Sequence, residues 1–107
     1  MKYLKDLETI ININSYTKNK VGVDKVTAYM SSWLKDLGFE HKSFERTEIG
    51  NHNLYTSPKI QGLKILLLGH NDTVFPKGKF EHYSEDAEWI YGPGVCDMKG
   101  GDRKSVV

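Results

Sequence analysis

The chain has 107 residues, the usual size of one small domain, so we expect a single modest core with little room for a second domain. Its 15 Lys and Arg residues nearly balance its 14 Asp and Glu residues, which argues against nucleic acid or an anionic membrane as the main partner, because both favour strongly basic surfaces. The single cysteine, Cys96, excludes an intrachain disulfide.

Two amphipathic helices are predicted at the beginning of the chain. In residues 3–14, four aliphatic side chains recur at helical spacing on one face: Leu4, Leu7, Ile10 and Ile11. In residues 22–37 a second apolar face repeats the pattern: Val23, Val26, Met30, Trp33, Leu34 and Leu37. Gly38 follows directly, where a left-handed helix cap favours glycine.

After Gly38 the pattern changes from helix to strand. Residues 39–46 and 49–56 are short β-prone segments, and residues 57–62 have the composition of a turn. Leu63 to Leu68 is nearly continuous aliphatic sequence, which is typical of a strand buried on both faces. We therefore expect an α/β fold in which the two helices pack on a mixed central sheet, with residues 63–68 as an interior strand.

No segment has the pattern of a membrane span or a secretion signal. The longest purely apolar run, Ile65 to Leu68, is far too short to cross a bilayer. Residues 1–8 include acidic side chains and no apolar signal core, so a cytoplasmic location is expected.

Polar residues follow the predicted interior strand. His70 comes directly after it, and a histidine held at a strand end has little freedom, which suits a metal ligand. Asp72 lies two residues further in extended backbone and so points to the same side, where a carboxylate can orient the imidazole ring. Taken alone, the pattern favours the simpler interpretation of a hydrogen-bonded loop histidine.

A glycine-rich loop surrounds a second carboxylate, Asp97. Residues 91–101 contain four glycines and a proline, and glycines let the backbone approach a site closely. A single carboxylate can bridge two metal ions, and such pairs polarise a carbonyl and activate water. The alternatives are a surface turn with a capping aspartate or a phosphate-binding loop, although the spacing of a P-loop is absent.

Together, residues 69–76 (Gly-His-Asn-Asp-Thr-Val-Phe-Pro) and 92–101 (Gly-Pro-Gly-Val-Cys-Asp-Met-Lys-Gly-Gly) closely resemble the paired signature of the M20 metallopeptidases. The sequence of residues 72–76 is most similar to that of the glutamate carboxypeptidase branch. The resemblance extends from about Leu4 to Gly101. It implies the N-terminal part of a zinc-peptidase-type catalytic domain.

The resemblance also implies roles for three residues. His70 would bind one zinc, Asp97 would bridge two zinc ions, and Asp72 would be the catalytic partner that fixes the geometry without binding metal. The implied reaction cleaves an amide bond beside a free carboxylate with a zinc-activated water. The implied substrate is a small peptide or an N-acyl amino acid, so deacylase or desuccinylase activity is an alternative within the family, whose members often dimerise through a lid domain.

The sequence departs from the family pattern as well. The family's Glu-Glu pair, its later acidic ligand, its distal histidine and its lid domain do not occur in these 107 residues. Residues 102–107 form a divergent polar tail where the family has an apolar helix. We therefore expect residues 1–107 to be a single partial domain, inactive alone. The alternatives are a non-catalytic truncated fragment or a small degenerate metal-binding module.

Several other polar residues carry no motif. Cys96 is interpreted as a small filler beside Asp97. Lys99 is interpreted either as a lysine that steers an anionic substrate or simply as an exposed lysine. The three remaining histidines are interpreted as surface or loop residues: His41, His52 and His82.

Overall fold

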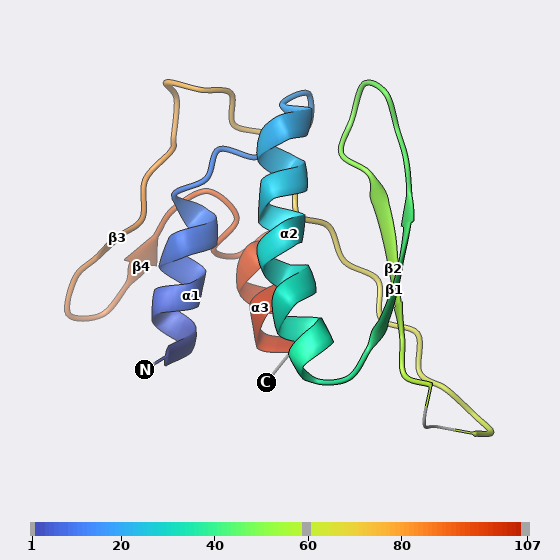
Figure 1. Cartoon of the computed structure of the whole chain (residues 1–107). Coiled ribbons are helices and arrows are strands. Elements are labelled where there is room, and N and C mark those ends of the chain that lie inside the picture. Colours follow the sequence, from blue (N-terminus) through green and yellow to red (C-terminus); the bar gives the residue numbers. More distant parts are fainter. Residues whose placement is uncertain (1, 59–60, 106–107) are drawn as a thin grey trace.

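The computed structural model describes residues 2–58 and 61–105, which form three helices and two small antiparallel sheets (Figure 1). The helices are α1 (Lys2–Ile11), α2 (Lys20–Asp36) and α3 (Lys99–Ser105). The strands are β1 (Glu40–Phe44), β2 (His52–Thr56), β3 (Ser84–Glu85) and β4 (Ile90–Tyr91). The expected α/β class is confirmed.

Both predicted helices form where their apolar spacing placed them. Helix α2 begins after Asn19, whose side chain accepts a hydrogen bond from the backbone N–H of Gly22 at 3.3 Å, so one of the first helical donors is satisfied. It ends before Gly38, which has a φ of 88° and supplies the left-handed residue expected there. Within the described residues, no helix is both long and apolar enough to cross a membrane.

The core lies between α1 and α2. Its buried members are the apolar residues that the helical pattern selected: Leu7, Ile10, Ile11, Val26 and Met30. Partly buried apolar residues of α2 and of the segments outside the two helices pack against them: Ile13, Trp33, Leu34, Tyr83 and Val95. Burying a large aliphatic side chain stabilises a fold by about 1.5–3 kcal/mol, so these two helices form the stable part of the molecule.

Helix α3 packs against α1, and in Figure 1 it lies behind the first two helices. Arg103 is only 7% exposed, and its Nη2 donates to Oδ2 of Asp6 at 2.6 Å. Its guanidinium also lies 4.9 Å from the centre of the Trp33 ring. The described part of the expected divergent tail, residues 102–105, therefore continues a helix, whereas residues 106–107 lie outside the described part.

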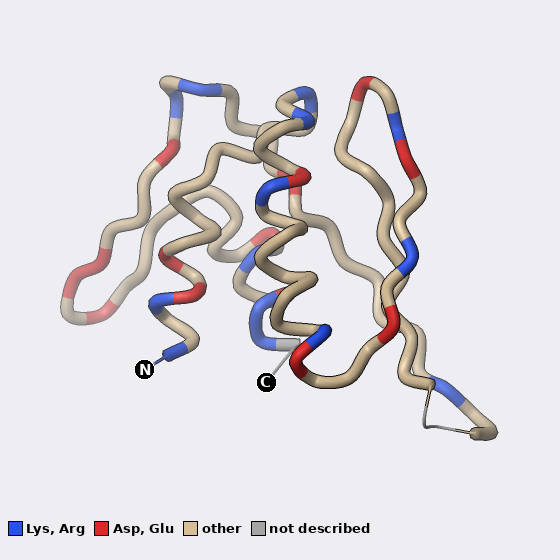
Figure 2. Tube along the Cα trace, in the orientation of Figure 1, with Lys and Arg blue, Asp and Glu red and all other residues tan. Residues whose placement is uncertain are grey.

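The two hairpins lie on opposite sides of the helices (Figure 1). In one, β1 pairs with β2 and Glu40 faces Thr56; in the other, β3 pairs with β4. Strands β1 and β2 fall within the expected β-prone segments 39–46 and 49–56. Residues 59–60 of the expected turn lie outside the described residues. Acidic and basic residues alternate along much of the chain, in keeping with its balanced charge (Figure 2).

The expected central sheet is wrong for this structure. Residues 63–68 form neither strand nor helix, and Leu63, Ile65, Leu66, Leu67 and Leu68 are between 72% and 101% exposed. A buried strand needs neighbouring backbones for hydrogen bonding and apolar layers above and below. The named strands of the described chain pair within their own hairpins, so they provide no such neighbours for this segment.

Candidate metal site

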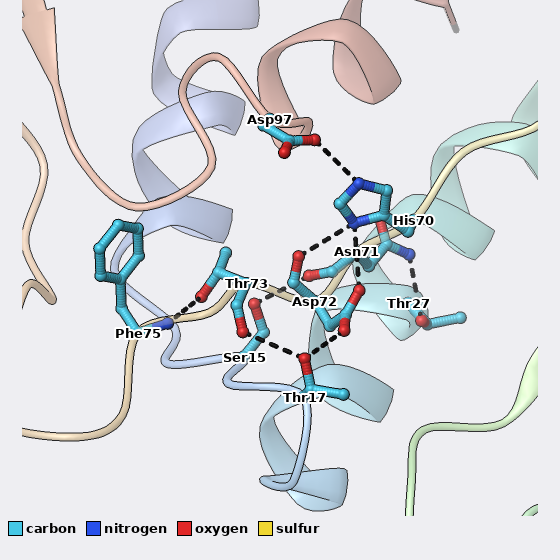
Figure 3. A network of polar contacts seen from close by, with 9 residues as sticks. All are labelled: Ser15, Thr17, Thr27, His70, Asn71, Asp72, Thr73, Phe75 and Asp97. Atoms are coloured by element: carbon cyan, nitrogen blue, oxygen red, sulfur yellow. Dashed lines mark hydrogen bonds and ion pairs between the residues drawn. The ribbon is translucent and has the colours of Figure 1, made fainter.

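The structure brings together the three site residues predicted from the sequence. Nε2 of His70 lies 2.9 Å from Oδ1 of Asp97. On the other side of the ring, Nδ1 lies 3.1 Å from both Oδ1 and the backbone oxygen of Asp72. Figure 3 shows the imidazole between the two carboxylates. This geometry places the residues, while their roles as ligands and catalytic partner remain predictions.

Residues 71–73 are held by the loop after α1 instead of by a sheet. Thr73 N–H donates to the Ser15 oxygen at 2.8 Å, and Thr17 N–H donates to the Thr73 oxygen at 3.0 Å. The Ser15 hydroxyl donates to the Asn71 oxygen at 2.8 Å. The Thr17 hydroxyl donates to Oδ2 of Asp72 at 2.5 Å. Asp72 is therefore fixed from behind, with its other oxygen facing His70 (Figure 3).

The side chain of Asn71 points away from the imidazole into the protein. Its Nδ2 donates to Oγ1 of Thr27 on α2 at 3.2 Å, while its Oδ1 is buried and has no hydrogen-bond partner among the described residues. This contact ties the His70 segment to a second helix. The neighbouring Gly69 is required for a different reason, because a Cβ there would collide with the carboxyl group of Asp102.

The loop before α3 presents Asp97 to solvent. The Asp97 side chain is 84% exposed, and the peptide bond to Met98 is cis. The prediction that Cys96 fills a small internal space is wrong, because Cys96 is exposed. The prediction that Lys99 is exposed is also wrong. Its side chain is fully buried, and its Nζ donates to the backbone oxygens of Ile10 at 2.8 Å and Ile13 at 3.1 Å.

The protonation of the site reflects its burial and its charges. Partial burial lowers the pKa of His70, but the hydrogen bond to Asp97 and the interactions with Asp72 outweigh it, so the net pKa is raised. Burial raises the pKa of Asp102 to about 6, against the opposing effect of His70. Burial lowers the pKa of Lys99 to about 8.

The chemistry of the site fits one edge of a metal centre. Imidazole and carboxylate ligands bind zinc at about 2.0–2.2 Å, so two tetrahedral ligand atoms lie about 3.3 Å apart. The observed distance of 2.9 Å between His70 Nε2 and Asp97 Oδ1 is slightly shorter than this. Because the Asp97 side chain is exposed, a small rotation of it would increase the distance to that of two ligands. Within the described residues, no group of three or more His, Cys, Asp or Glu side chains is arranged around a common point.

The site opens into a hollow of about 360 Å³ beside the two carboxylates. Its remaining walls are apolar or glycine residues together with a threonine and Cys96: Thr73, Val74, Phe75, Phe80, Gly92 and Gly94. Phe75 and Phe80 meet edge to face with their ring centres 5.1 Å apart.

Sequence reasoning missed the residues that hold the site in place. Ser15 and Thr17 lie in the loop after α1, more than fifty residues before the side chains they contact, and no motif marks them. Lys99 lies within the glycine-rich signature, and its apolar stem could have suggested burial. A lysine is rarely buried unless its amino group is paired, however, and the sequence shows no partner for it. Only the folded chain shows that the C-terminal end of α1 provides that partner.

Comparison with known proteins finds relatives but no matching family profile. The chain is 32% identical over 103 residues to carboxypeptidase G2 of Pseudomonas sp. (strain RS-16), covering 92% of this chain and 25% of that protein. It is 34% identical to acetylornithine deacetylase of Vibrio campbellii, covering 92% and 28%. It is 33% identical to an uncharacterized metallohydrolase of Methanocaldococcus jannaschii, covering 94% and 26%.

These relatives are all M20-family hydrolases, so the family resemblance read from residues 69–76 and 92–101 is confirmed. The similarity extends over most of the chain. The chain itself spans about a quarter of the length of the curated relatives it matches.

Proposed function

We propose that this chain, a homologue of the M20-family hydrolases, carries one wall of a metal-dependent amide hydrolase site. In this proposal His70 and Asp97 are metal ligands, and Asp72 is the partner that orients His70. The observation that supports it is the position of one imidazole between two carboxylates, with Nε2 and the Asp97 carboxylate at the edge of the hollow.

Zinc is the ion we propose, and in a complete site Asp97 would help to hold two such ions. Imidazole and carboxylate are both common zinc ligands. A bound ion would lower the pKa of a coordinated water and polarise a substrate carbonyl. The remaining ligands and the general base are not supplied by the described residues around His70, so we propose that these 107 residues alone do not complete the site.

The residues of this chain orient the proposed ligand His70. With a metal bound, Nδ1–H of His70 would donate to Asp72, which would leave the lone pair of Nε2 for the metal. Thr17 holds the second oxygen of Asp72, so the carboxylate cannot rotate away from the ring. Asp97 contributes an exposed carboxylate from the opposite side.

The substrate class we propose is a small peptide or an N-acyl amino acid with an amide bond next to a free carboxylate. The name of the carboxypeptidase relative and the sequence of residues 72–76 favour a peptide as the substrate. The names of the deacetylase relatives favour an N-acyl amino acid as the second candidate. The apolar walls of the hollow suit the side chain of either.

Titration with cobalt(II), a coloured stand-in for zinc, tests the proposed ligands. We expect weak binding, because two protein ligands are fewer than the three that catalytic zinc usually has. His70→Ala and Asp97→Ala should each abolish the binding, whereas His41→Ala, which removes an exposed histidine bonded to Asn53, should leave it unchanged. Binding that survives His70→Ala would refute the assignment, and two ions bound at sub-micromolar affinity would refute the idea that the site is incomplete.

A further inference from the structure

Lys99 is the most deeply buried charged residue among those the structure describes, and the proposed chemistry does not use it. It begins α3, two residues after Asp97. Its Nζ donates to the backbone oxygens of Ile10 and Ile13 at 2.8 and 3.1 Å. The Ile10 oxygen lies in the last turn of α1, where carbonyl groups lack helical partners and the helix dipole favours a cation, and Ile13 lies two residues beyond the helix.

The glycine-rich loop wraps around the stem of the same side chain. A Cβ at Gly94 would lie 3.0 Å from both Cγ and Cδ of Lys99, which is tighter than ordinary contact, and Gly94 has a φ of 82°. The N–H of Gly100 donates to the Gly94 oxygen at 3.1 Å and closes the loop. The path of the backbone on both sides of Asp97 is therefore shaped by Lys99.

The other half of the site depends on the same part of the chain. His70 is held through Asp72 by Thr17, and residues 71–73 pair with Ser15 and Thr17. Lys99 reaches Ile10 and Ile13 only a few residues earlier. Residues 10–17 thus form a common support for two segments that are far apart in the sequence.

We propose that Lys99 is a positioning residue, which sets the distance between Asp97 and His70 by tying the Asp97 loop to the C-terminal end of α1. Asp97 is 84% exposed, and His70 is its only side-chain hydrogen-bond partner within the described part of the chain, so its own contacts do not fix the loop. The consequence for metal binding rests on the proposed function above, whereas the consequence for the His70–Asp97 contact does not.

The test compares two buried basic residues of α3 that both contact α1. Lys99→Met keeps the apolar stem and removes the donor, and Lys99→Gln keeps a shorter donor in case the methionine variant does not fold. Arg103→Met is the matched control, because the Arg103 side chain donates to Asp6 near the beginning of α1 and, among the described residues, forms no hydrogen bond with the Asp97 loop. Circular dichroism checks that each variant is folded.

The readout is the ¹⁵N spectrum of the His70 ring in the metal-free chain, recorded at a pH where the ring is neutral. In the wild-type chain, Asp97 attracts a proton to Nε2 in competition with Asp72 at Nδ1. We expect Lys99→Met and Lys99→Gln to shift the tautomer ratio toward Nδ1–H, as Asp97→Ala does, while Arg103→Met matches the wild-type chain. A wild-type ratio in a folded Lys99 variant would overturn the proposal.

Cobalt(II) binding gives the second readout and separates the two proposals. Loss of a group that supports a metal ligand typically weakens binding about 10- to 100-fold, and we expect Lys99→Met to weaken it about tenfold. If the wild-type chain binds no cobalt(II) but the tautomer ratio still depends on Lys99, the proposed function fails and the positioning role stands. If cobalt(II) binds equally well in the wild-type chain and in folded Lys99→Met, the positioning role fails and the proposed ligands stand.

Discussion

The hydroxyl of Thr17 donates a hydrogen bond to Oδ2 of Asp72, which lies 55 residues later in the chain. The other carboxylate oxygen of Asp72 faces Nδ1 of His70, so a residue in the loop after α1 controls the orientation of the proposed ligand. This relationship links the stable helical part of the fold to the site.

Thr17→Val should therefore weaken metal binding without removing a ligand. The change keeps the side-chain shape and leaves Oδ2 of Asp72 without its donor, which should weaken cobalt(II) binding about tenfold and destabilise the fold by about 1.5–3 kcal/mol. Titration and urea unfolding measure the two effects. Thr9→Val is the control, because Thr9 makes only an exposed bond within α1. Equal effects of the two substitutions would contradict a specific role for Thr17.

The ion pair between Arg103 and Asp6 should contribute to stability in an asymmetric way. Their side chains are 9% and 18% exposed, so Asp6→Ala leaves a buried guanidinium without its carboxylate. Removing one partner of a buried pair costs about 3–5 kcal/mol, whereas replacing both is often nearly neutral. We expect Asp6→Ala to lower the free energy of unfolding by about 3 kcal/mol, and the double variant Asp6→Ala/Arg103→Met to recover much of it. Additive losses in urea unfolding would show that the pair is not coupled.

Stability should rise with pH in the alkaline range because of Lys99. Burial lowers its pKa in the folded chain to about 8 from the ordinary lysine value of 10.5, so the unfolded chain binds more protons between these values. The free energy of unfolding should therefore increase from about pH 8 to 10.5, and the contribution is lost as the pH falls through 8. Unfolding curves of the wild-type chain and Lys99→Met, compared at each pH, isolate this effect, and a parallel pH dependence of the two would count against it.

The sequence predicted the helices well because their apolar faces pack against each other in the core. Leu7 and Val26 recur at helical spacing and meet in the core, so a local pattern and a tertiary contact agree. It also predicted that His70 and Asp97 lie close, although for a partly wrong reason. Residues 63–68 do not form the strand that was to deliver His70, and hydrogen bonds from the loop after α1 place it instead.

The parts that the sequence could not predict depend on long-range partners. An aliphatic run such as residues 63–68 specifies apolar burial but not what covers it, so its state depends on which surfaces the rest of the fold offers. The burial of Lys99 depends in the same way on two carbonyl groups nearly ninety residues earlier. Spacing within a motif carries no information on either.

The exposed aliphatic segment should make the chain self-associate. Five of the six side chains in residues 63–68 are apolar and at least 72% exposed, and such segments without proline readily pair as strands. We expect Leu66→Lys to raise the concentration at which light scattering first detects aggregates. Val21→Lys likewise replaces an exposed aliphatic side chain with lysine, but at an isolated position on α2, so it should hardly change this concentration. Equal gains from both variants would point to net charge as the cause.

The last prediction is that the chain alone does not hydrolyse amide bonds. The reaction needs a base to take a proton from water and donors to stabilise the oxyanion, and general acid–base catalysis alone contributes about 10²- to 10⁴-fold. Loss of one oxyanion donor costs about 10²- to 10³-fold more. His70 and Asp97 supply neither function if both bind metal, and Asp72 is held by Thr17 and His70. An assay of the zinc-supplemented chain with a C-terminal glutamate amide and an N-acetyl amino acid should therefore give the background rate. Turnover that Asp97→Ala abolishes would show instead that these 107 residues suffice for catalysis.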